Sequence, residues 1–272
     1  MARIHPTAIV DKGAQLADDV EVGPHCVIEG EVRIGAGCVL REHAIIRRYT
    51  TIGERNLIDA FCVFGGEPQD LKFDPRTVSH LRIGNDNVFR ESVTISRGSR
   101  EANATVVGNK TYWMALAHAG HDATIHDQVI LTNGAAVGGH AEVGQRAILS
   151  GHVTVHQFCW IGEGVMTQGQ SGFSTHLPPF TMGANINKLV GLNTVGLRRN
   201  PEITDTDRKQ IKEAFRLLYR SGLGGQGALE EMDARTDWGA PAARFREFLR
   251  RVLEAKPPYN RGLCQLRSGA DP

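Results

Sequence analysis

The chain has 272 residues, 41% of them hydrophobic, and its 31 basic and 30 acidic side chains leave a formal net charge of +1. This length is ample for a large buried core, and the balanced charge argues against a nucleic-acid-binding protein. No apolar run approaches the roughly 18 residues needed to span a bilayer, and the first residues lack the apolar stretch of a signal peptide. The sequence therefore predicts a cytosolic protein without a membrane span.

A large apolar residue recurs at every sixth position through the N-terminal part of the chain. These positions are Ile4, Val10, Leu16, Val22, Ile28, Ile34, Leu40, Ile46, Ile52, Ile58 and Phe64. Four residues after them stand small or slim side chains: Ala8, Ala14, Val20, Cys26, Val32, Cys38, Ala44, Thr50 and Cys62. A period of six fits neither an α-helix nor one long strand. It predicts an all-β solenoid in which three hexads close one triangular coil.

The same period returns after two interruptions. It continues through Ile83, Phe89, Ile95, Val107, Trp113, Ala119, Ile125, Leu131, Val137, Val143, Leu149, Val155, Ile161, Thr167 and Phe173. The interruptions lie at about residues 65–82 and 96–106, and both are polar and contain glycine. Insertions into a regular solenoid often carry its binding function. We therefore expect a β-solenoid domain over residues 1–200 with loop insertions at these two places.

Helical periodicity replaces the hexads in a second domain, predicted over residues 201–272. Apolar residues recur at helical spacing from Asp205, and Gly222 is a plausible stop. A further helix is expected from about Ala242 to Glu254, ahead of a pair of prolines. The last dozen residues are expected to be frayed. The chain is thus predicted to end in a helical tail.

The cysteines follow the repeat. Cys26, Cys38, Cys62 and Cys159 all fall on the inward series of small residues, and only Cys264 lies outside it. We expect the first four to fill the core and not to bind metal or form disulfides, which fits a reducing compartment.

A dense polar cluster lies where two hexads meet, in the segment 117–123. The alanines at both ends of this segment take inward positions, which pushes His118 and His121 to the outside or the corner of the coil. Asp122 could accept a hydrogen bond from one ring nitrogen and leave the other free as a general base. Further histidines on later hexads are His140, His152 and His156.

Several segments carry a more specific resemblance. They are His118-Ala119-Gly120-His121-Asp122, Val155-His156-Gln157-Phe158-Cys159, Gln69-Asp70-Leu71-Lys72-Phe73, Arg90-Glu91-Ser92-Val93-Thr94-Ile95, Pro178-Pro179 and Leu217-Leu218-Tyr219-Arg220-Ser221-Gly222. The hexads resemble the left-handed parallel β-helix of bacterial hexapeptide acyltransferases. The segments, in this order, resemble the UDP-N-acetylglucosamine O-acyltransferases of lipid A biosynthesis. This resemblance implies the left hand of the coil, C-terminal α-helices, and a homotrimer with clefts between neighbours.

The resemblance also implies a reaction. A 3-hydroxyacyl group would pass from acyl carrier protein to the 3-hydroxyl of UDP-N-acetylglucosamine in the first step of lipid A biosynthesis. The donor would be the phosphopantetheine thioester of the carrier, with no other cofactor, no metal and no covalent enzyme intermediate. His121 would act as general base, and Asp122 would orient its ring and stabilise the imidazolium. The backbone N–H of Gly139 would stabilise the oxyanion.

Substrate contacts follow from the same resemblance. Lys72 and the pair Arg198 and Arg199 offer cations for the nucleotide phosphates. The other implied contacts are Gln69, Asp70, His118, His140, His156, Gln157 and Asn193. Gly169 matches the position that gauges acyl-chain length in the family, and a glycine leaves room for a longer chain. Basic residues expected to meet the acidic carrier protein are Arg216, Arg220, Arg244, Arg246, Arg250 and Arg251.

Two positions depart from the family pattern. Val195 stands where a Glu usually lies near the nucleotide, and Ser96 stands where a His commonly precedes Arg-Gly. The loss of these polar groups leaves a 3-amino analogue of the sugar open as the acceptor, which would give an amide in place of an ester.

Three other classes of protein remain as alternatives. A zinc-dependent γ-type carbonic anhydrase uses the same kind of coil and holds zinc with three histidines across a subunit interface. A sister acyltransferase that acts on the sugar amine normally carries an N-terminal uridine-binding domain, whereas the hexads here begin at Ile4. A non-enzymatic scaffold would not need clustered His, Asp and Lys.

Overall fold

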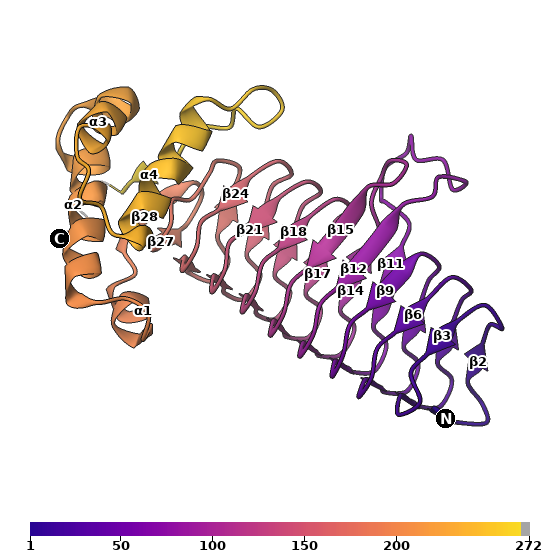
Figure 1. The fold of residues 1–272 in the computed structure, drawn as a ribbon. Coiled ribbons are helices and arrows are strands. Elements are labelled where there is room, and N and C mark those ends of the chain that lie inside the picture. Colours follow the sequence, from indigo (N-terminus) through magenta and orange to yellow (C-terminus); the bar gives the residue numbers. More distant parts are fainter. Residues whose placement is uncertain (268–272) are drawn as a thin grey trace.

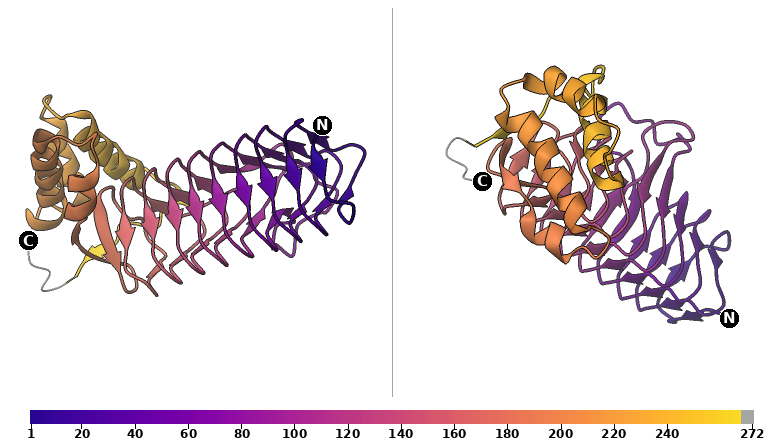
Figure 2. Two further views of the ribbon diagram at one scale, coloured as in Figure 1. Left: turned by 90° about the horizontal axis from the view of Figure 1, so that it is seen from below. Right: turned by 60° about the vertical axis from the view of Figure 1, so that its left-hand side comes forward.

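Three parallel sheets form the long body of the molecule in the computed structural model, which describes residues 1–267 (Figure 1). The chain visits the sheets in turn, so each coil contributes one short strand to each sheet and the coils stack into a triangular prism. Helices gather at one end of the prism, and the N-terminus lies at the other (Figures 1 and 2). The expected left-handed parallel β-helix with a helical tail is confirmed.

The strands sort into sheets A, B and C. Sheet A contains β1 (Arg3–Ile4), β4 (Glu21–Val22), β7 (Val39–Leu40), β10 (Leu57–Ile58), β13 (Val88–Phe89), β16 (Tyr112–Trp113), β19 (Ile130–Leu131), β22 (Ile148–Leu149), β25 (Met166–Thr167), β27 (Thr181–Ala184), β28 (Lys188–Leu192) and β29 (Gln265–Leu266). Sheet B contains β2 (Ile9–Val10), β5 (Val27–Ile28), β8 (Ile45–Ile46), β11 (Val63–Gly66), β14 (Thr94–Ser96), β17 (His118–Ala119), β20 (Ala136–Val137), β23 (Thr154–Val155) and β26 (Gly172–Phe173). Sheet C contains β3 (Gln15–Leu16), β6 (Arg33–Ile34), β9 (Thr50–Ile52), β12 (His80–Ile83), β15 (Ala104–Val107), β18 (Thr124–Ile125), β21 (Glu142–Val143) and β24 (Trp160–Ile161).

The hexads build the core as the sequence predicts. Register pairs such as Val22 with Leu40 and Ile28 with Ile46 stack like residues above like along each sheet. These large residues are at most 3% exposed, and the small residues four positions later are fully buried from Val20 onward. The cysteines of the repeat are all buried, which confirms that they fill the core. The core is therefore a continuous set of aliphatic ladders.

The corners between strands require an unusual backbone. Many corner residues that are not glycine have positive φ, among them Asp122 at 59° and His140 at 59°. This left-handed region costs energy for most residues, so the stacked coils on either side must hold it in place. Corner side chains consequently point away from the core and are available for chemistry.

Two loops leave the coil on the same side. Excursion 1 (residues 67–79) separates β11 from β12, and excursion 2 (residues 97–103) separates β14 from β15. They contact each other, because the Ala102 N–H donates to the Val78 carbonyl over 2.9 Å. Figure 1 shows these loops rising from the body next to β12 and β15.

Four helices follow the coil within residues 1–267: α1 (Thr194–Arg199), α2 (Asp205–Arg220), α3 (Gly224–Asp233) and α4 (Ala240–Leu253). The predicted helices correspond to α2 and α4. A capping box between Thr204 and Asp207 fixes the start of α2. Two helices were missed: α1 is short, and α3 opens with glycines that disfavour a helix.

The helical end closes the coil. β27 and β28 form an antiparallel hairpin on the last coil, and β29 pairs with β28, so the prediction that the last dozen residues are frayed is wrong at Gln265–Leu266. Residues 268–272 lie outside the described part of the chain. Helices α2, α3 and α4 pack around a second apolar core that includes Ile211, Phe215 and Phe245. No helix among residues 1–267 combines the length and apolar character that a membrane crossing demands.

Candidate active site

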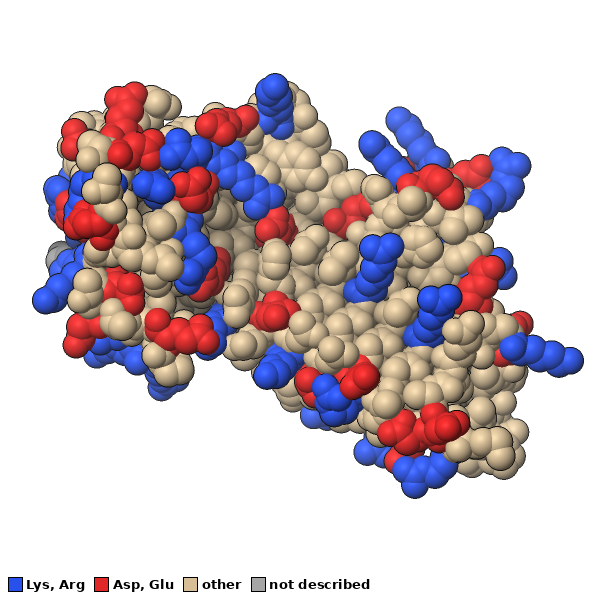
Figure 3. All heavy atoms as spheres, in the orientation of Figure 1, with Lys and Arg blue, Asp and Glu red and all other residues tan. Residues whose placement is uncertain are grey.

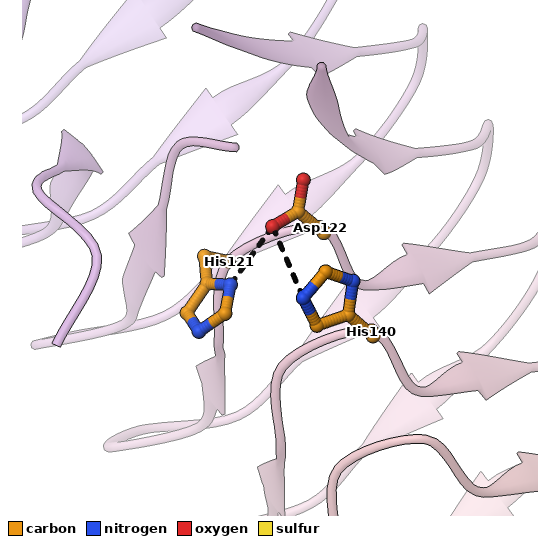
Figure 4. A group of neighbouring side chains, drawn as sticks. All are labelled: His121, Asp122 and His140. Atoms are coloured by element: carbon orange, nitrogen blue, oxygen red, sulfur yellow. Dashed lines mark hydrogen bonds and ion pairs between the residues drawn. The ribbon is translucent and has the colours of Figure 1, made fainter. Parts of the chain in front are cut away.

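His121, Asp122 and His140 meet at the edge where sheet B passes into sheet C (Figure 4). His121 and Asp122 form the corner between β17 and β18, and His140 lies on the corner one coil later. The coil-to-coil hydrogen bond from the His140 N–H to the His121 carbonyl, 2.9 Å, fixes these two corners together. His140, on the next coil, thus adds to the cluster that the sequence predicts in segment 117–123.

The His121–Asp122 pair has the geometry of an oriented base. His121 Nδ1 lies 2.8 Å from Asp122 Oδ2, and their side chains are 16% and 6% exposed. A carboxylate accepts hydrogen bonds, so the proton of the neutral ring resides on Nδ1. No hydrogen bond among residues 1–267 uses Nε2 of His121. That nitrogen can therefore accept a proton from a bound ligand.

Asp122 is held as an anion. It accepts hydrogen bonds from the Ser99 N–H, 3.0 Å, and from Asn103 Nδ2, 3.2 Å, both on excursion 2. Its own N–H donates to Thr105 Oγ1 over 2.8 Å. Burial raises the pKa of the carboxyl, but the hydrogen bonds from His121 and Ser99 outweigh it and lower the pKa to about 2. The carboxylate is thus both ionised and fixed in direction.

His140 completes the cluster in a different way. Its Nε2 lies 3.6 Å from Asp122 Oδ2, its ring meets that of His121 edge to face, and it stacks on Phe158 with centroids 4.7 Å apart. Burial lowers the pKa of His140 more than the Asp122 carboxylate raises it. A neutral His140 can offer one donor and one acceptor to a ligand.

Gly139 lies directly against the base. A Cβ at this position would sit 2.8 Å from His121 Nε2, closer than such atoms can approach. The backbone hydrogen bonds within residues 1–267 use the N–H groups of Gly138 and His140 but not that of Gly139. A glycine here leaves room for a ligand atom and presents a free donor beside the ring.

A hollow of about 730 Å³ opens over this cluster. Excursion 1 lines it with Gln69, Asp70 and Lys72, as the sequence predicts, and Gln157 joins them from the coil. The lining residues that were not predicted as contacts from the sequence are Leu71, Phe73, Asp74, Thr77, Ser99, Arg100 and Phe158. Phe158 follows His140 by the same interval that separates His140 from Asp122, so the coil period could have identified it.

Both signs of charge line the hollow on the side of the excursions, because Asp70 and Asp74 lie there beside two basic residues. Lys72 and Arg100 both line it, and Figure 3 shows Lys and Arg side chains projecting at the upper right, where the excursions rise in Figure 1. Burial of a phosphate or thioester oxygen here would be favoured by these cations.

Of the other histidines named from the sequence, His118 and His156 do not line the hollow, and His152 lies on a different edge, where sheet A passes into sheet B. His118 points outward from β17, where its Nδ1 lies 2.8 Å from Thr94 Oγ1, and burial lowers its pKa. His156 Nδ1 lies 3.0 Å from the Gln157 carbonyl. His118 is thus committed to a strand neighbour on the same sheet.

A second hollow of about 350 Å³ lies near the edge where sheet C passes into sheet A. Arg199, Asn193 and Val195 line it, but Arg198 does not, and its Nε donates instead to the Thr194 carbonyl over 3.3 Å. The Asn193 side chain caps α1 by accepting from the Gly196 N–H and also donates to the Gly164 carbonyl. The two hollows share no lining residue.

The third edge, where sheet A passes into sheet B, carries Gly169. It lies exposed in the turn between β25 and β26, and a Cβ there would contact the Gly151 carbonyl at 3.3 Å. A single chain therefore distributes the site residues predicted from the sequence over all three edges of the prism.

His121, Asp122 and His140 form the group within residues 1–267 that could hold a metal ion. Their potential metal-ligand atoms all lie within 4.8 Å of one another. The set is two histidines and a carboxylate, and its carboxylate oxygen is already bonded to the His121 ring. The three-histidine set of the hydratase alternative is not gathered at this corner.

Comparisons with known proteins cover nearly the whole chain. A family profile described as Udp N-acetylglucosamine O-acyltransferase, domain 2, matches residues 177–264, and one for six bacterial transferase hexapeptide repeats matches residues 13–48. An acyl-[acyl-carrier-protein]–UDP-N-acetylglucosamine O-acyltransferase of Syntrophobacter fumaroxidans is 41% identical over 250 residues, 91% of this chain and 96% of that protein. A protein of the same name from Thiobacillus denitrificans is 40% identical over 97% of this chain and 100% of its own length.

Solved structures agree with these relatives. LpxA from Acinetobacter baumannii superposes with a TM-score of 0.89 at 32% identity, covering 96% of this chain and 99% of that one. The UDP-N-acetylglucosamine O-acyltransferase from Moraxella catarrhalis gives a TM-score of 0.87 at 35% identity, with the same coverage of 96% and 99%.

Proposed function

This chain belongs to the acyl-[acyl-carrier-protein]–UDP-N-acetylglucosamine O-acyltransferase family, and we propose from that membership that it acylates UDP-N-acetylglucosamine in lipid A biosynthesis. The donor is the 3-hydroxyacyl thioester on the phosphopantetheine of acyl carrier protein, and the acceptor is the 3-hydroxyl of the sugar. The observation that carries the mechanism is the His121–Asp122 pair, 2.8 Å apart, beneath a hollow whose lining includes Lys72 and Arg100. The relatives favour this reaction over the 3-amino acceptor and over a zinc-dependent hydratase.

His121 starts the reaction as general base. Its Nε2 takes the proton of the sugar hydroxyl while that oxygen attacks the thioester carbonyl, and the Asp122 carboxylate stabilises the imidazolium that forms. An imidazole suits this step because its ordinary pKa lies near neutral pH. No metal and no acyl-enzyme intermediate is needed, since the acceptor oxygen attacks the thioester directly.

The tetrahedral intermediate places a negative charge on the former carbonyl oxygen. The Gly139 N–H, which lies beside the His121 ring and has no acceptor within residues 1–267, supplies the donor for that oxyanion. Collapse of the intermediate breaks the carbon–sulfur bond. The leaving thiolate takes the proton from the imidazolium, which returns His121 to its neutral form.

A homotrimer brings the remaining site residues to this corner. Arg199 and Asn193 line a hollow at a different edge of the prism, and Gly169 lies on the third edge. Three prisms packed side by side place different edges of neighbours against one another. In this arrangement the nucleotide contacts Lys72 and Gln69 from one chain and Arg199 from the next, and Gly169 limits the acyl chain. Gln157, Asp70, His140, His118 and His156 complete the proposed contacts.

The carrier protein docks on α2 in this proposal. Of the arginines expected to meet it, Arg244, Arg246, Arg250 and Arg251 are engaged in ion pairs with carboxylates of this chain. Figure 3 accordingly shows the two signs of charge interleaved over the helical end. Arg220 lies over the Phe215 ring and lines a hollow of about 740 Å³ with Lys209, Lys212 and Arg216. Arg216 is paired with Glu213, which lines the same hollow, but Lys209, Lys212 and Arg220 leave the hollow basic. It therefore suits an acidic partner better than the paired face of α4.

A turnover assay of the purified protein tests the proposal. UDP-N-acetylglucosamine and its 3-amino analogue are each offered with a series of 3-hydroxyacyl carrier proteins of different chain length. We expect an ester on the first sugar, and the preferred length reports on Gly169. Acylation of the amine alone would overturn the assigned acceptor and would make Val195 and Ser96 the residues to examine.

A further inference from the structure

Arg97 is buried although it carries a full positive charge. It directly follows β14 at the start of excursion 2, is 2% exposed, and ranks among the largest fully buried side chains. Its N–H donates over 2.9 Å to the carbonyl of Gly66, the last residue of β11 before excursion 1. Burial of a charge is unfavourable unless the charge is paired and hydrogen-bonded, so the position of this side chain requires an explanation.

The guanidinium joins excursion 1 to the coil. Its central carbon lies 5.3 Å from the centroid of the Tyr49 ring, which belongs to a corner of the coil, and 5.3 Å from that of Phe73, which belongs to the excursion. Nη2 donates to the Pro75 carbonyl over 3.3 Å and lies 3.8 Å from the Glu67 carboxylate. One side chain thus contacts excursion 1 at three points and the rigid coil at a fourth.

These contacts do not make Arg97 a good core residue. Its Nε has no hydrogen-bond partner among the described residues. The ion pair with Glu67 is weak, because Nη2 and the carboxylate oxygen are 3.8 Å apart and the Glu67 side chain is 59% exposed. An apolar residue of similar volume would fill the same space without leaving a donor unsatisfied. An arginine differs from such an apolar residue because its flat cation contacts two aromatic rings and a loop carbonyl at the same time and so fixes their relative positions.

That arrangement determines one wall of the hollow over His121. Phe73 lines the hollow together with Gln69, Asp70 and Lys72 of the same excursion. Excursion 1 contains no strand, and few of its backbone groups are hydrogen-bonded to the coil. The side chains that would meet the sugar nucleotide are therefore on a loop whose fixed points include Arg97.

We propose that Arg97 is a positioning residue for the acceptor substrate. It keeps excursion 1 ordered over the corner of His121, and it does so from within the protein, without touching the ligand. The identity of that ligand rests on the proposed function, whereas the ordering of the loop does not.

Two variants and a control test this. Arg97→Met retains an unbranched apolar stem but loses the charge and the flat group, and Arg97→Lys retains the stem and the charge but not the flat group. Arg76→Met is the control, because Arg76 lies on the same excursion with its side chain 90% exposed. Amide hydrogen exchange is measured over residues 67–79 and over the coil strands, followed by KM and kcat with UDP-N-acetylglucosamine.

For Arg97→Met we expect faster exchange in residues 67–79 with unchanged coil strands. We also expect a rise of about tenfold in the KM for the sugar nucleotide with a much smaller change in kcat. Arg97→Lys restores part of both effects, and Arg76→Met resembles the wild type. Unchanged exchange in the excursion, or faster exchange throughout the coil, would overturn the inference. If the wild type does not acylate this sugar, the exchange measurement still decides whether Arg97 orders the loop.

Discussion

His121 Nδ1 and Asp122 Oδ2 lie 2.8 Å apart on one corner of the coil, and this contact determines that Nε2 is the ring nitrogen facing the hollow. The carboxylate is fixed by excursion 2 and ionised at any pH near neutrality, because its pKa is lowered to about 2. The proposed base and its orienting group are therefore both set in the absence of substrate.

Asp122→Asn should leave the coil folded and reduce kcat by about 10²-fold or more, because an amide no longer stabilises the imidazolium or selects the ring tautomer. Steady-state kinetics with saturating substrates measures this. A variant with wild-type kcat would show that the carboxylate only anchors Ser99 and Asn103 of excursion 2.

Gly139→Ala should abolish turnover through steric crowding. The added methyl would lie 2.8 Å from His121 Nε2, where the sugar oxygen must approach. Circular dichroism should show an intact coil, because the methyl meets the outward-facing His121 and no core side chain. Gly151→Ala is a matched control, since a Cβ there meets nothing closer than 3.7 Å. Normal activity in Gly139→Ala would contradict the placement of the reacting atoms.

Mixed oligomers test whether the site is shared between chains. His121→Ala and Arg199→Glu variants should each be inactive alone. When they are unfolded together and refolded, clefts that combine His121 of one chain with Arg199 of the other are intact, so part of the activity returns. Mixing without refolding serves as the control. Failure to regain activity, with co-assembly demonstrated by mass spectrometry, would contradict a site that combines His121 of one chain with Arg199 of another.

The link between α4 and the coil gives a pH dependence. Burial raises the pKa of Glu142, but hydrogen bonds from His126 and Arg251 lower it to about 2, and the Glu142 bond raises the pKa of His126. The Glu142 contribution to stability is present above its unfolded pKa of about 4.3 and is lost as the pH falls toward 2. The His126 contribution is present below about 6.5 and is lost as the pH rises through the raised value.

Glu142→Gln should therefore lower Tm most between these limits, by roughly 2–4 °C for each kcal/mol removed, and the difference from wild type should shrink in acid. Differential scanning fluorimetry over this pH range provides the measurement. A difference in Tm that is constant with pH would exclude the ionised contact as its cause.

Much of the fold follows from the period of the sequence. The hexads specify which residues are buried, and closure of three hexads into a coil places Asp122, His140 and Phe158 on one edge. A periodic pattern carries this information because each turn contacts only its neighbours. The interruptions of the pattern likewise indicated excursion 1, whose residues line the hollow.

The remainder depends on contacts that no local pattern encodes. The sequence alone indicates that Arg97 is an exposed polar loop residue. Its burial is explained by the packing of Tyr49 and Phe73 around it, which no local pattern predicts. β29 forms because the chain returns to pair with β28. The sequence predicts Arg199, Gly169 and His121 for one site, whereas a single chain holds them on different edges. The proposed trimer is what would bring them together.

The most direct measurement compares acyl transfer by the wild type and by His121→Ala, using UDP-N-acetylglucosamine and a 3-hydroxyacyl carrier protein, with nucleotide binding measured by calorimetry on the same samples. The account predicts that His121→Ala lowers kcat by about 10²- to 10⁴-fold while the nucleotide still binds. A variant that retains most of its turnover would contradict the assignment of His121 as the base and with it the proposed mechanism.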